Sequence, residues 1–197
     1  MGNLIYSVTT SLDGYVADEK GNFDWTEPSE ETLLFVDNVL RNVRTFLFGR
    51  KLYETMSVWD AMTNDRSNKG VEQFANIWKI ANKIVYSTSL TQVNTVNTII
   101  KSKFDVEKIK AMVAKSDYDF NIGGPNLAAT AIKAGIVDEI HQYIAPIIVG
   151  GGNFWLPKNY EAKLEAIDVR RFKNGCVHLQ YKSVDKAITD LRLTLTS

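Results

Sequence analysis

Three apolar segments of this chain each end in glycine or hydroxyl residues, and a helix is expected to follow two of them. The segments with their polar ends are 45–51 (TFLFGRK), 84–89 (IVYSTS) and 120–128 (FNIGGPNLA). Strands that alternate with helices are typical of a largely parallel sheet with helices on both faces. In such a sheet the carboxyl ends of the strands gather at one edge, where ligands bind. The pattern therefore predicts an α/β fold in which strands 45–48, 83–86 and 119–122 are parallel neighbours that end at one cleft.

The rest of the chain fits this arrangement. Apolar and β-branched runs predict further strands at 3–12, 93–100 and 137–149. Apolar residues at helical spacing, together with start and stop signals, predict helices at 28–43, 50–57, 71–81, 105–115 and 126–134. A closing antiparallel hairpin is expected from residues 164–172 and 176–184, which flank Lys173-Asn174-Gly175.

Composition excludes several classes of function. Lysine plus arginine and aspartate plus glutamate each number 23, so the formal net charge is zero, and no dense basic block is present. A nucleic-acid-binding domain usually has a basic excess on one face, so we do not expect nucleic acid as a partner. The single cysteine, Cys176, cannot form an internal disulfide. His141 and His178 fall in strand patterns and no cluster has the spacing of metal ligands, so we expect structural histidines and no metal.

The start of the chain and its hydropathy predict a cytoplasmic protein. The sequence passes from Met1 directly into an apolar strand pattern, without the charged lead and cleavage site of a signal peptide. No stretch of about 18 apolar residues is present, so no membrane span is expected.

The three strand ends carry groups that suit phosphates. Gly49 allows close backbone approach, and Arg50 and Lys51 place two positive charges where the helix dipole disfavours them, which suggests an anionic ligand. Ser87-Thr88-Ser89 offers hydroxyl donors, and Gly123-Gly124 precedes a helix whose first backbone N–H groups are free to bind a pyrophosphate. Each has a simpler interpretation: a solvated helix start, a turn with local hydroxyl bonds, or a tight strand-to-helix turn.

Six short motifs, in this order, make the chain resemble the dihydrofolate reductase-like superfamily. They are 10–17 (TSLDGYVA), 49–54 (GRKLYE), 87–90 (STSL), 122–128 (IGGPNLA), 135–140 (GIVDEI) and 146–152 (PIIVGGG). Within the superfamily, the chain most resembles the C-terminal reductase domain of the riboflavin-biosynthesis enzyme, the RibD C-terminal family. The resemblance implies a three-layer α/β domain over residues 1–184, with a mostly parallel central sheet, a C-terminal antiparallel hairpin and helices on both faces. Residues 185–197 would be a tail of unknown role.

The resemblance also implies an NADPH site, with NADH as the alternative cofactor. The backbone around Thr9, Val16 and Ala17 would face the nicotinamide, and Gly49, Arg50 and Lys51 would hold the bridging phosphates. Ser87, Thr88 and Ser89 would face the adenosine ribose and any 2′-phosphate. A cradle for the pyrophosphate would be made by Ile122, Gly123, Gly124, Pro125, Asn126 and Leu127.

Two positions depart from the pattern of the family. Its members often carry threonine where this chain has Leu52, which removes a hydroxyl near the phosphates. They often carry arginine where this chain has Thr88, and an arginine there would pair with a 2′-phosphate through its planar fork. The second departure leaves open the choice between NADPH and NADH, but not dinucleotide binding.

Reduction of a C=N or C=O bond also requires a proton. By rough alignment Glu31 falls near the carboxylate that dihydrofolate reductases place on their first helix, with Phe35 one turn later on the same face. Asp13 lies in the turn that borders the nicotinamide, and Trp59 could wall a flat substrate. The alternatives are a first-turn acid for Glu31, a plain turn residue for Asp13, and core packing for Trp59.

The function expected from the resemblance is an NAD(P)H-dependent reductase of a small flat heterocycle of pterin or pyrimidine type. A riboflavin-pathway diaminopyrimidinone is the first candidate substrate. A true dihydrofolate reductase and a dinucleotide-binding protein without catalysis are the alternatives. We also expect a homodimer, in which the apolar strand from Cys176 to Val184 would pair across an edge.

Overall fold

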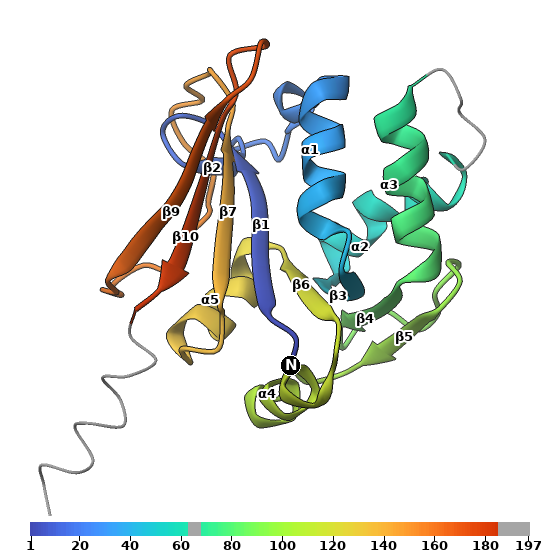
Figure 1. Cartoon of the computed structure of the whole chain (residues 1–197). Coiled ribbons are helices and arrows are strands. Elements are labelled where there is room, and N and C mark those ends of the chain that lie inside the picture. Colours follow the sequence, from blue (N-terminus) through green and yellow to red (C-terminus); the bar gives the residue numbers. More distant parts are fainter. Residues whose placement is uncertain (63–67, 185–197) are drawn as a thin grey trace, which may run out of the picture.

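The computed structural model of the protein describes residues 1–62 and 68–184, and its centre is an eight-stranded sheet (Figure 1). The strand order is β5-β4-β3-β6-β1-β7-β10-β9, and every pairing from β5 to β7 is parallel. The strands β10 and β9 form the antiparallel hairpin that closes the sheet. The strand bounds are β1 Leu4–Thr10, β3 Val43–Gly49, β4 Asn82–Tyr86, β5 Thr98–Lys101, β6 Asp119–Gly123, β7 Glu139–Ile144, β9 Leu164–Arg171 and β10 Val177–Ser183.

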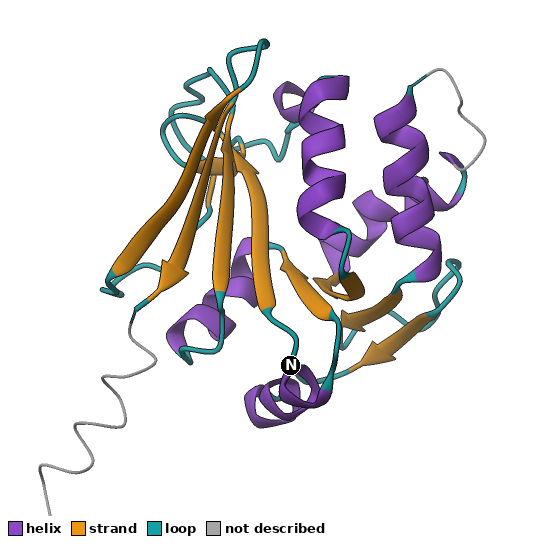
Figure 2. Ribbon diagram, in the orientation of Figure 1, coloured by secondary structure: helices purple, strands orange, loops and turns teal. Residues whose placement is uncertain are grey.

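Helices cover both faces of this sheet, which makes three layers (Figure 2). On one face lie α1 (Glu30–Leu40), α2 (Arg50–Met56) and α3 (Lys69–Ile80), and on the other lie α4 (Val106–Lys115) and α5 (Pro125–Lys133). A second, two-stranded sheet joins β2 (Tyr15–Ala17) to β8 (Asn153–Phe154). Two short 3₁₀ helices, η1 (Asp24–Thr26) and η2 (Ser57–Asp60), complete the described elements. The expected fold class is therefore confirmed.

The helices begin where local side chains can bind their free backbone N–H groups. The Ser29 hydroxyl accepts from Thr32 N at 3.2 Å at the start of α1, and Asp105 accepts from Lys108 N at 3.1 Å at the start of α4. At α5 the cap is Gly124 and Pro125 occupies the first turn, where a missing N–H costs nothing. These starts fall within a few residues of the expected ones.

Two large apolar clusters, and a smaller third one around Tyr143, Phe172 and Cys176, fill the space between the layers. One large cluster packs Tyr6, Leu47 and Ile122 of the sheet against α4 and α5, and the other large cluster packs Phe46 and Phe48 against α1, α2 and α3. Alternate residues of one strand thus enter opposite cores, as β3 shows with Leu47 between its two phenylalanines. The sequence of a strand that is buried on both faces is a nearly continuous apolar run, and for this reason β3 could be predicted.

The strands β3, β4 and β6, whose carboxyl ends carry the glycine and hydroxyl groups suited to phosphates, are parallel neighbours, as expected. β3 pairs with β4 on one side, where Gly49 faces Tyr86, and with β6 on the other, where Phe48 faces Gly123. Their carboxyl ends therefore lie next to one another on one edge of the sheet.

Three expectations about strands were wrong. The expected strand 137–149 ends at Ile144, before Pro146, because proline has no N–H to give to a neighbouring strand. The expected strand 93–100 begins only at Thr98, after Asn97 turns the chain with a positive φ of 54°. The strand from Cys176 to Val184 is not an edge, since β10 pairs with β7 and β9; at this end of the sheet the edge strand is β9, and all its residues are exposed.

No helix within the described residues is both long and apolar enough to cross a membrane. The same part of the chain contains no group of three or more histidine, cysteine, aspartate or glutamate residues placed to hold a metal ion. Residues 185–197, expected to be a tail, lie outside the described residues.

Candidate active site

The candidate site is the edge of the sheet where β4, β3, β6 and β1 end side by side. Along this edge lie the Ser87 turn after β4, Gly49 at the end of β3, the Gly123-Gly124 pair after β6, and Thr9 near the end of β1. The sequence separates these groups by up to about a hundred residues, and the parallel pairings bring them together. Of the other residues expected to bind the cofactor, Pro125, Asn126 and Leu127 form the first turn of α5, and Val16 and Ala17 lie in β2 of the small second sheet.

The junction after β6 has the geometry expected of a backbone cradle. Gly124 has a φ of +87°, a conformation that residues with a Cβ rarely adopt, and it caps α5. The first N–H groups of α5 consequently point out of the helix at the sheet edge. Gly123 is required for a different reason: a Cβ there would lie 2.6 Å from Leu52 Cδ2 and 2.8 Å from Phe48 Cε1. The absence of a side chain at Gly123 lets α2 and the start of α5 pack closely.

The junction after β3 is open. A Cβ placed on Gly49 would meet no atom of the described chain within 4 Å, so space remains above this backbone. Gly49 has φ −78° and ψ 164°, values that any residue adopts. Arg50 forms an ion pair with Glu54, with Nη1 and Oε1 3.2 Å apart, and both side chains are nearly half exposed. An exposed pair of this kind contributes little to stability, so Arg50 can turn toward a ligand at small cost.

The turn after β4 uses two of its three hydroxyls locally, since Ser87 Oγ and Ser89 Oγ are hydrogen-bonded at 3.4 Å. Ser87 Oγ accepts from Leu90 N at 2.9 Å and from Ser89 N at 3.2 Å. Thr88 and Ser89 are exposed. The N–H of Ser87 donates to the carbonyl of Lys101 at 2.9 Å, and Lys101 is the register partner of Tyr86. The end of β5 thus places a lysine beside this turn, which sequence reasoning missed because β5 was expected to end at residue 100.

The end of β1 is surrounded by a folded-back loop. The carboxylate of Asp13 accepts from Gly150 N at 2.8 Å and from Val149 N at 3.2 Å, which ties the loop after β1 to the loop after β7. The Ser11 hydroxyl, and then these backbone donors, lower the pKa of Asp13. A carboxyl held in this way is ionised at neutral pH, so this geometry favours the turn-residue interpretation over a proton donor.

Glu31 and Trp59 make packing and pairing contacts. Glu31 Oε2 accepts from Lys173 N at 3.2 Å and Oε1 lies 4.0 Å from Arg170 Nη2, so Glu31 joins α1 to the tip of the β9–β10 hairpin. The ring of Trp59 packs on Phe74 with centroids 4.5 Å apart, in the cluster beneath α3. The catalytic role of Glu31 and the substrate role of Trp59 stay predictions that these contacts do not favour.

Phe35 lies over the sheet beside the end of β1. Its ring centroid is 4.8 Å from that of His178, 5.4 Å from Phe172 and 6.4 Å from Tyr143. Tyr143 is in turn the register partner of Thr9, which the resemblance places at the nicotinamide. Phe35 therefore packs on aromatic side chains of β7, β10 and the turn between β9 and β10, and its role at a substrate stays a prediction.

Sequence reasoning missed Asp37. It is only 4% exposed, and both its carboxylate oxygens are buried without a hydrogen-bond partner among the described residues. Burial raises the pKa of Asp37 to about 7. The signal was present in the sequence, because Asp37 lies four residues after Leu33 and three before Leu40, on the apolar stripe of the helix.

Comparisons with known proteins show the family of this chain. The family model of the RibD C-terminal domain matches residues 3–118 and 121–178, so the chain belongs to this family. A relative from Bacillus subtilis (strain 168), the uncharacterized protein YyaP, is 25% identical over 184 residues, which span 90% of this chain and 93% of the relative.

Two solved structures are similar to the structure of this chain. A putative riboflavin biosynthesis protein from Shewanella sp. PV-4 superposes with a TM-score of 0.70 at 21% identity, covering 93% of this chain and 99% of that one. A dihydrofolate reductase from Enterococcus faecalis, solved in complex with NADP(H), superposes with a TM-score of 0.61 at 16% identity, covering 93% and 98%. At these identities the likeness shows the fold, which is dihydrofolate reductase-like.

Proposed function

We propose that the protein is an NADPH-dependent reductase that transfers hydride to a small flat heterocycle of the aminopyrimidine type. The nicotinamide would supply the hydride, and the protein would orient its ring and exclude water from it. The pyrophosphate would lie on Gly123, Gly124 and the first N–H groups of α5, and Arg50 and Lys51 would hold the bridging phosphates.

One observation supports this proposal most strongly: Gly49 has open space above it, beside the capped start of α5 and the hydroxyl turn after β4. A pyrophosphate needs closely spaced donors around a backbone without side chains, and these neighbours supply them. The family membership and the Shewanella protein, named as a putative riboflavin biosynthesis protein, support an aminopyrimidine of that pathway as the substrate. A panel of pterins, aminopyrimidines and quinones, each tested for NADPH oxidation, would identify the substrate class.

Filling the space above Gly49 tests the cofactor site. Because the backbone of Gly49 suits any residue, we expect Gly49→Leu to fold with a stability loss of no more than about 1 kcal/mol. Its side chain would occupy the place of the phosphates, so the dissociation constant for NADPH should rise at least about tenfold, or about 1.4 kcal/mol. Fluorescence titration with NADPH measures the change, and Ala134→Leu at an exposed position is the control. Equal affinity in the two variants would place the dinucleotide elsewhere.

The choice between NADPH and NADH depends on the turn after β4. Thr88 can donate one hydroxyl to a 2′-phosphate, and Lys101 adds a nearby positive charge, so we expect a modest preference for NADPH. A hydrogen bond to a charged group contributes about 1.5–3 kcal/mol, so Thr88→Arg should raise this preference roughly tenfold or more. Dissociation constants for both cofactors at one salt concentration test this. Asn82→Arg, at the other end of β4, controls for added charge, and an unchanged ratio in Thr88→Arg would contradict the placement.

A further inference from the structure

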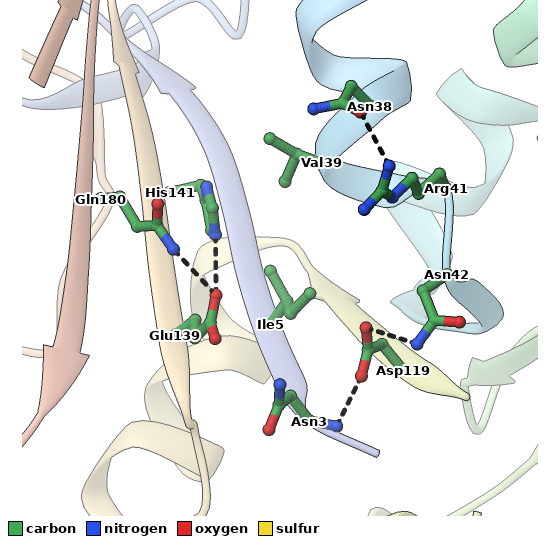
Figure 3. Close-up of a pocket in the computed structure, with 10 residues that line it drawn as sticks. All are labelled: Asn3, Ile5, Asn38, Val39, Arg41, Asn42, Asp119, Glu139, His141 and Gln180. Atoms are coloured by element: carbon green, nitrogen blue, oxygen red, sulfur yellow. Dashed lines mark hydrogen bonds and ion pairs between the residues drawn. The ribbon is translucent and has the colours of Figure 1, made fainter. Parts of the chain in front are cut away.

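A pocket of about 670 Å³ opens between α1 and the sheet (Figure 3). It lies at the amino ends of the parallel strands, because its lining includes Asn3 just before β1, Asp119 at the start of β6 and Glu139 at the start of β7. The proposed cofactor site is at the opposite, carboxyl ends of these strands. A ligand in this pocket would therefore be separate from the cofactor, whether or not the protein is a reductase.

The sheet side of the pocket presents a carboxylate that the protein holds in one position. Glu139 Oε2 accepts from Gln180 Nε2 at 3.0 Å and lies 3.3 Å from His141 Nε2. The hydrogen bond with His141 lowers the pKa of Glu139, so this group is an anion at neutral pH. His141 is itself fixed by His178, whose Nε2 lies 3.0 Å from His141 Nδ1. The carboxylate is therefore already in place before a ligand binds.

The other oxygen of this carboxylate is free. Glu139 Oε1 has no hydrogen-bond partner within residues 1–62 and 68–184, and the side chain is 17% exposed. The side-chain carbonyl of Gln180, beside it, also lacks a partner in this part of the chain. Lys182, the register partner of Glu139, forms no ion pair with it. Two adjacent acceptors without a donor, one of them charged, suit a cationic N–H group such as an ammonium.

The helix side of the pocket presents a cation instead. Arg41 directly follows α1 and is exposed, and its Nη1 lies 3.5 Å from Asn38 Oδ1, which is at most a weak hydrogen bond. Arg41 forms no ion pair with any described residue, so most of its five N–H donors remain available to an anion. The side-chain nitrogen of Asn38 adds a neutral donor on the same side.

Apolar side chains separate these two charged groups. Figure 3 shows Ile5 and Val39 between Glu139, on the sheet side, and Arg41, on the helix side. A ligand with a single charge would leave the charged side chain on the opposite side of the pocket without a partner. A ligand with an ammonium at one end, a carboxylate at the other and a short apolar part between them would satisfy both.

Asp119 is the third charged residue with a fixed sign that lines the pocket, and the fold uses both of its oxygens. Oδ1 accepts from the backbone N–H of Asn3 at 2.7 Å, and Oδ2 accepts from Asn42 Nδ2 at 3.0 Å. These bonds join the start of β6 to the start of β1 and to the residue before β3. Glu139 and Arg41 are therefore the charged groups of the lining that remain available to a ligand.

We propose that this pocket binds a small zwitterion of the amino-acid class. Its ammonium donates to Glu139 Oε1 and Gln180 Oε1. Its carboxylate accepts from Arg41 and Asn38, and its carbon chain lies on the apolar side chains between them. The contacts to Glu139 and Arg41 are charge-assisted hydrogen bonds, which are about twice as strong as neutral ones.

Three probes with the same carbon chain test whether both charges are needed. They are γ-aminobutyrate, which is a zwitterion, butylamine, which is a cation, and butyrate, which is an anion; glycine and ε-aminocaproate are a shorter and a longer zwitterion. Amide NMR titrations of the full chain measure the dissociation constants. We expect one of the zwitterions to bind at least about tenfold more tightly than butylamine and butyrate. Its binding should shift the amide signals of Ile5, Val39 and Gln180.

Matched substitutions locate the site. Glu139→Gln and Arg41→Gln each remove one charge and should weaken the binding of that zwitterion at least about tenfold. Glu165→Gln and Arg171→Gln make the same changes on the exposed strand β9 and should leave the dissociation constant unchanged. Asn38→Asp, at an exposed helix position that the fold should tolerate, is a second variant on the helix side and should weaken binding by repelling the carboxylate.

Two kinds of result would overturn the proposal. Butylamine that binds as tightly as the zwitterions would show a simple cation site at Glu139. Equal losses of affinity in the β9 variants, signal shifts confined to residues outside the lining, or no saturable binding of any probe at millimolar concentration would show that the pocket is not the site. None of these measurements uses NADPH, so their failure leaves the proposed reductase function standing.

Discussion

Replacing Asp37 with asparagine is expected to stabilise the fold by about 4 kcal/mol at pH 8 and by almost nothing at pH 4. Asp37 lies on the inner face of α1, one turn after Leu33, whose Cβ would be 2.7 Å from a Cβ on Gly70 of α3. Asp37 is only 4% exposed, and its carboxylate oxygens have no hydrogen-bond partner in the described chain. Asparagine keeps the shape and removes the charge.

The sign of this pH dependence of stability follows from the raised pKa of Asp37. Because burial raises the pKa of Asp37 to about 7, the folded state holds the proton more tightly than the unfolded state between about pH 4 and pH 7. The contribution of Asp37 to stability therefore falls as pH rises through this window and is constant above it. The pKa of His178 is lowered and gives the opposite slope at acid pH, but that contribution cancels when variant and wild type are compared.

Urea unfolding at several pH values measures the difference between the two proteins. Asp117→Asn, at an exposed position, is the control and should have no such pH dependence. A difference between Asp37→Asn and wild type that is the same at pH 4 and pH 8 would show that the carboxyl is not desolvated in the native state.

The second large effect on stability and cofactor binding is expected from substitution of Gly152. This residue immediately precedes β8, the strand that pairs with β2 in the small sheet. Gly152 has a φ of +127°, and a Cβ there would lie 2.1 Å from the carbonyl oxygen of Ala17. Gly152→Ala must therefore displace the backbone that the resemblance places at the nicotinamide. We expect a stability loss of about 3 kcal/mol or more and loss of NADPH oxidation. Thermal unfolding and the oxidation assay measure the two effects.

Gly150→Ala is the matched control for this clash. Gly150 also has a positive φ, of 80°, but a Cβ there would meet nothing within 4 Å. Its replacement should cost only the strain of the left-handed conformation, about 1–2 kcal/mol, and should leave NADPH binding in place. If both variants lose binding equally, the fit between Gly152 and Ala17 is not what holds the nicotinamide loop.

The sequence was most informative where local pattern and tertiary role coincide. The runs around Phe46, Ile84 and Ile122 are apolar because their strands are buried on both faces, so both the strands and their parallel order could be predicted. Pro146 is the opposite case: the apolar run continues through it, but the missing N–H ends the pairing.

The polar interior could not be predicted because its partners are distant in sequence. Glu31 accepts a hydrogen bond from Lys173, which is 142 residues away in the sequence, and His141 is hydrogen-bonded to His178, which is 37 residues away. No local sequence pattern specifies which strands will be adjacent. The two histidines had no nearby partner along the chain, and only the pairing of β7 with β10 brings their rings together.

The contact between Leu52 and Gly123 has a consequence for how this family can vary. The leucine side chain occupies the space that any Cβ at position 123 would need, so the two positions are not independent. A smaller residue at position 52 would remove one of the two clashes, and the Phe48 ring, 2.8 Å from the same Cβ, would also have to move before alanine fits after β6. Among relatives, a substitution at position 52 should therefore often be accompanied by a substitution at position 123. The helix α2, which follows β3, would in this way limit which residues can evolve at the end of β6.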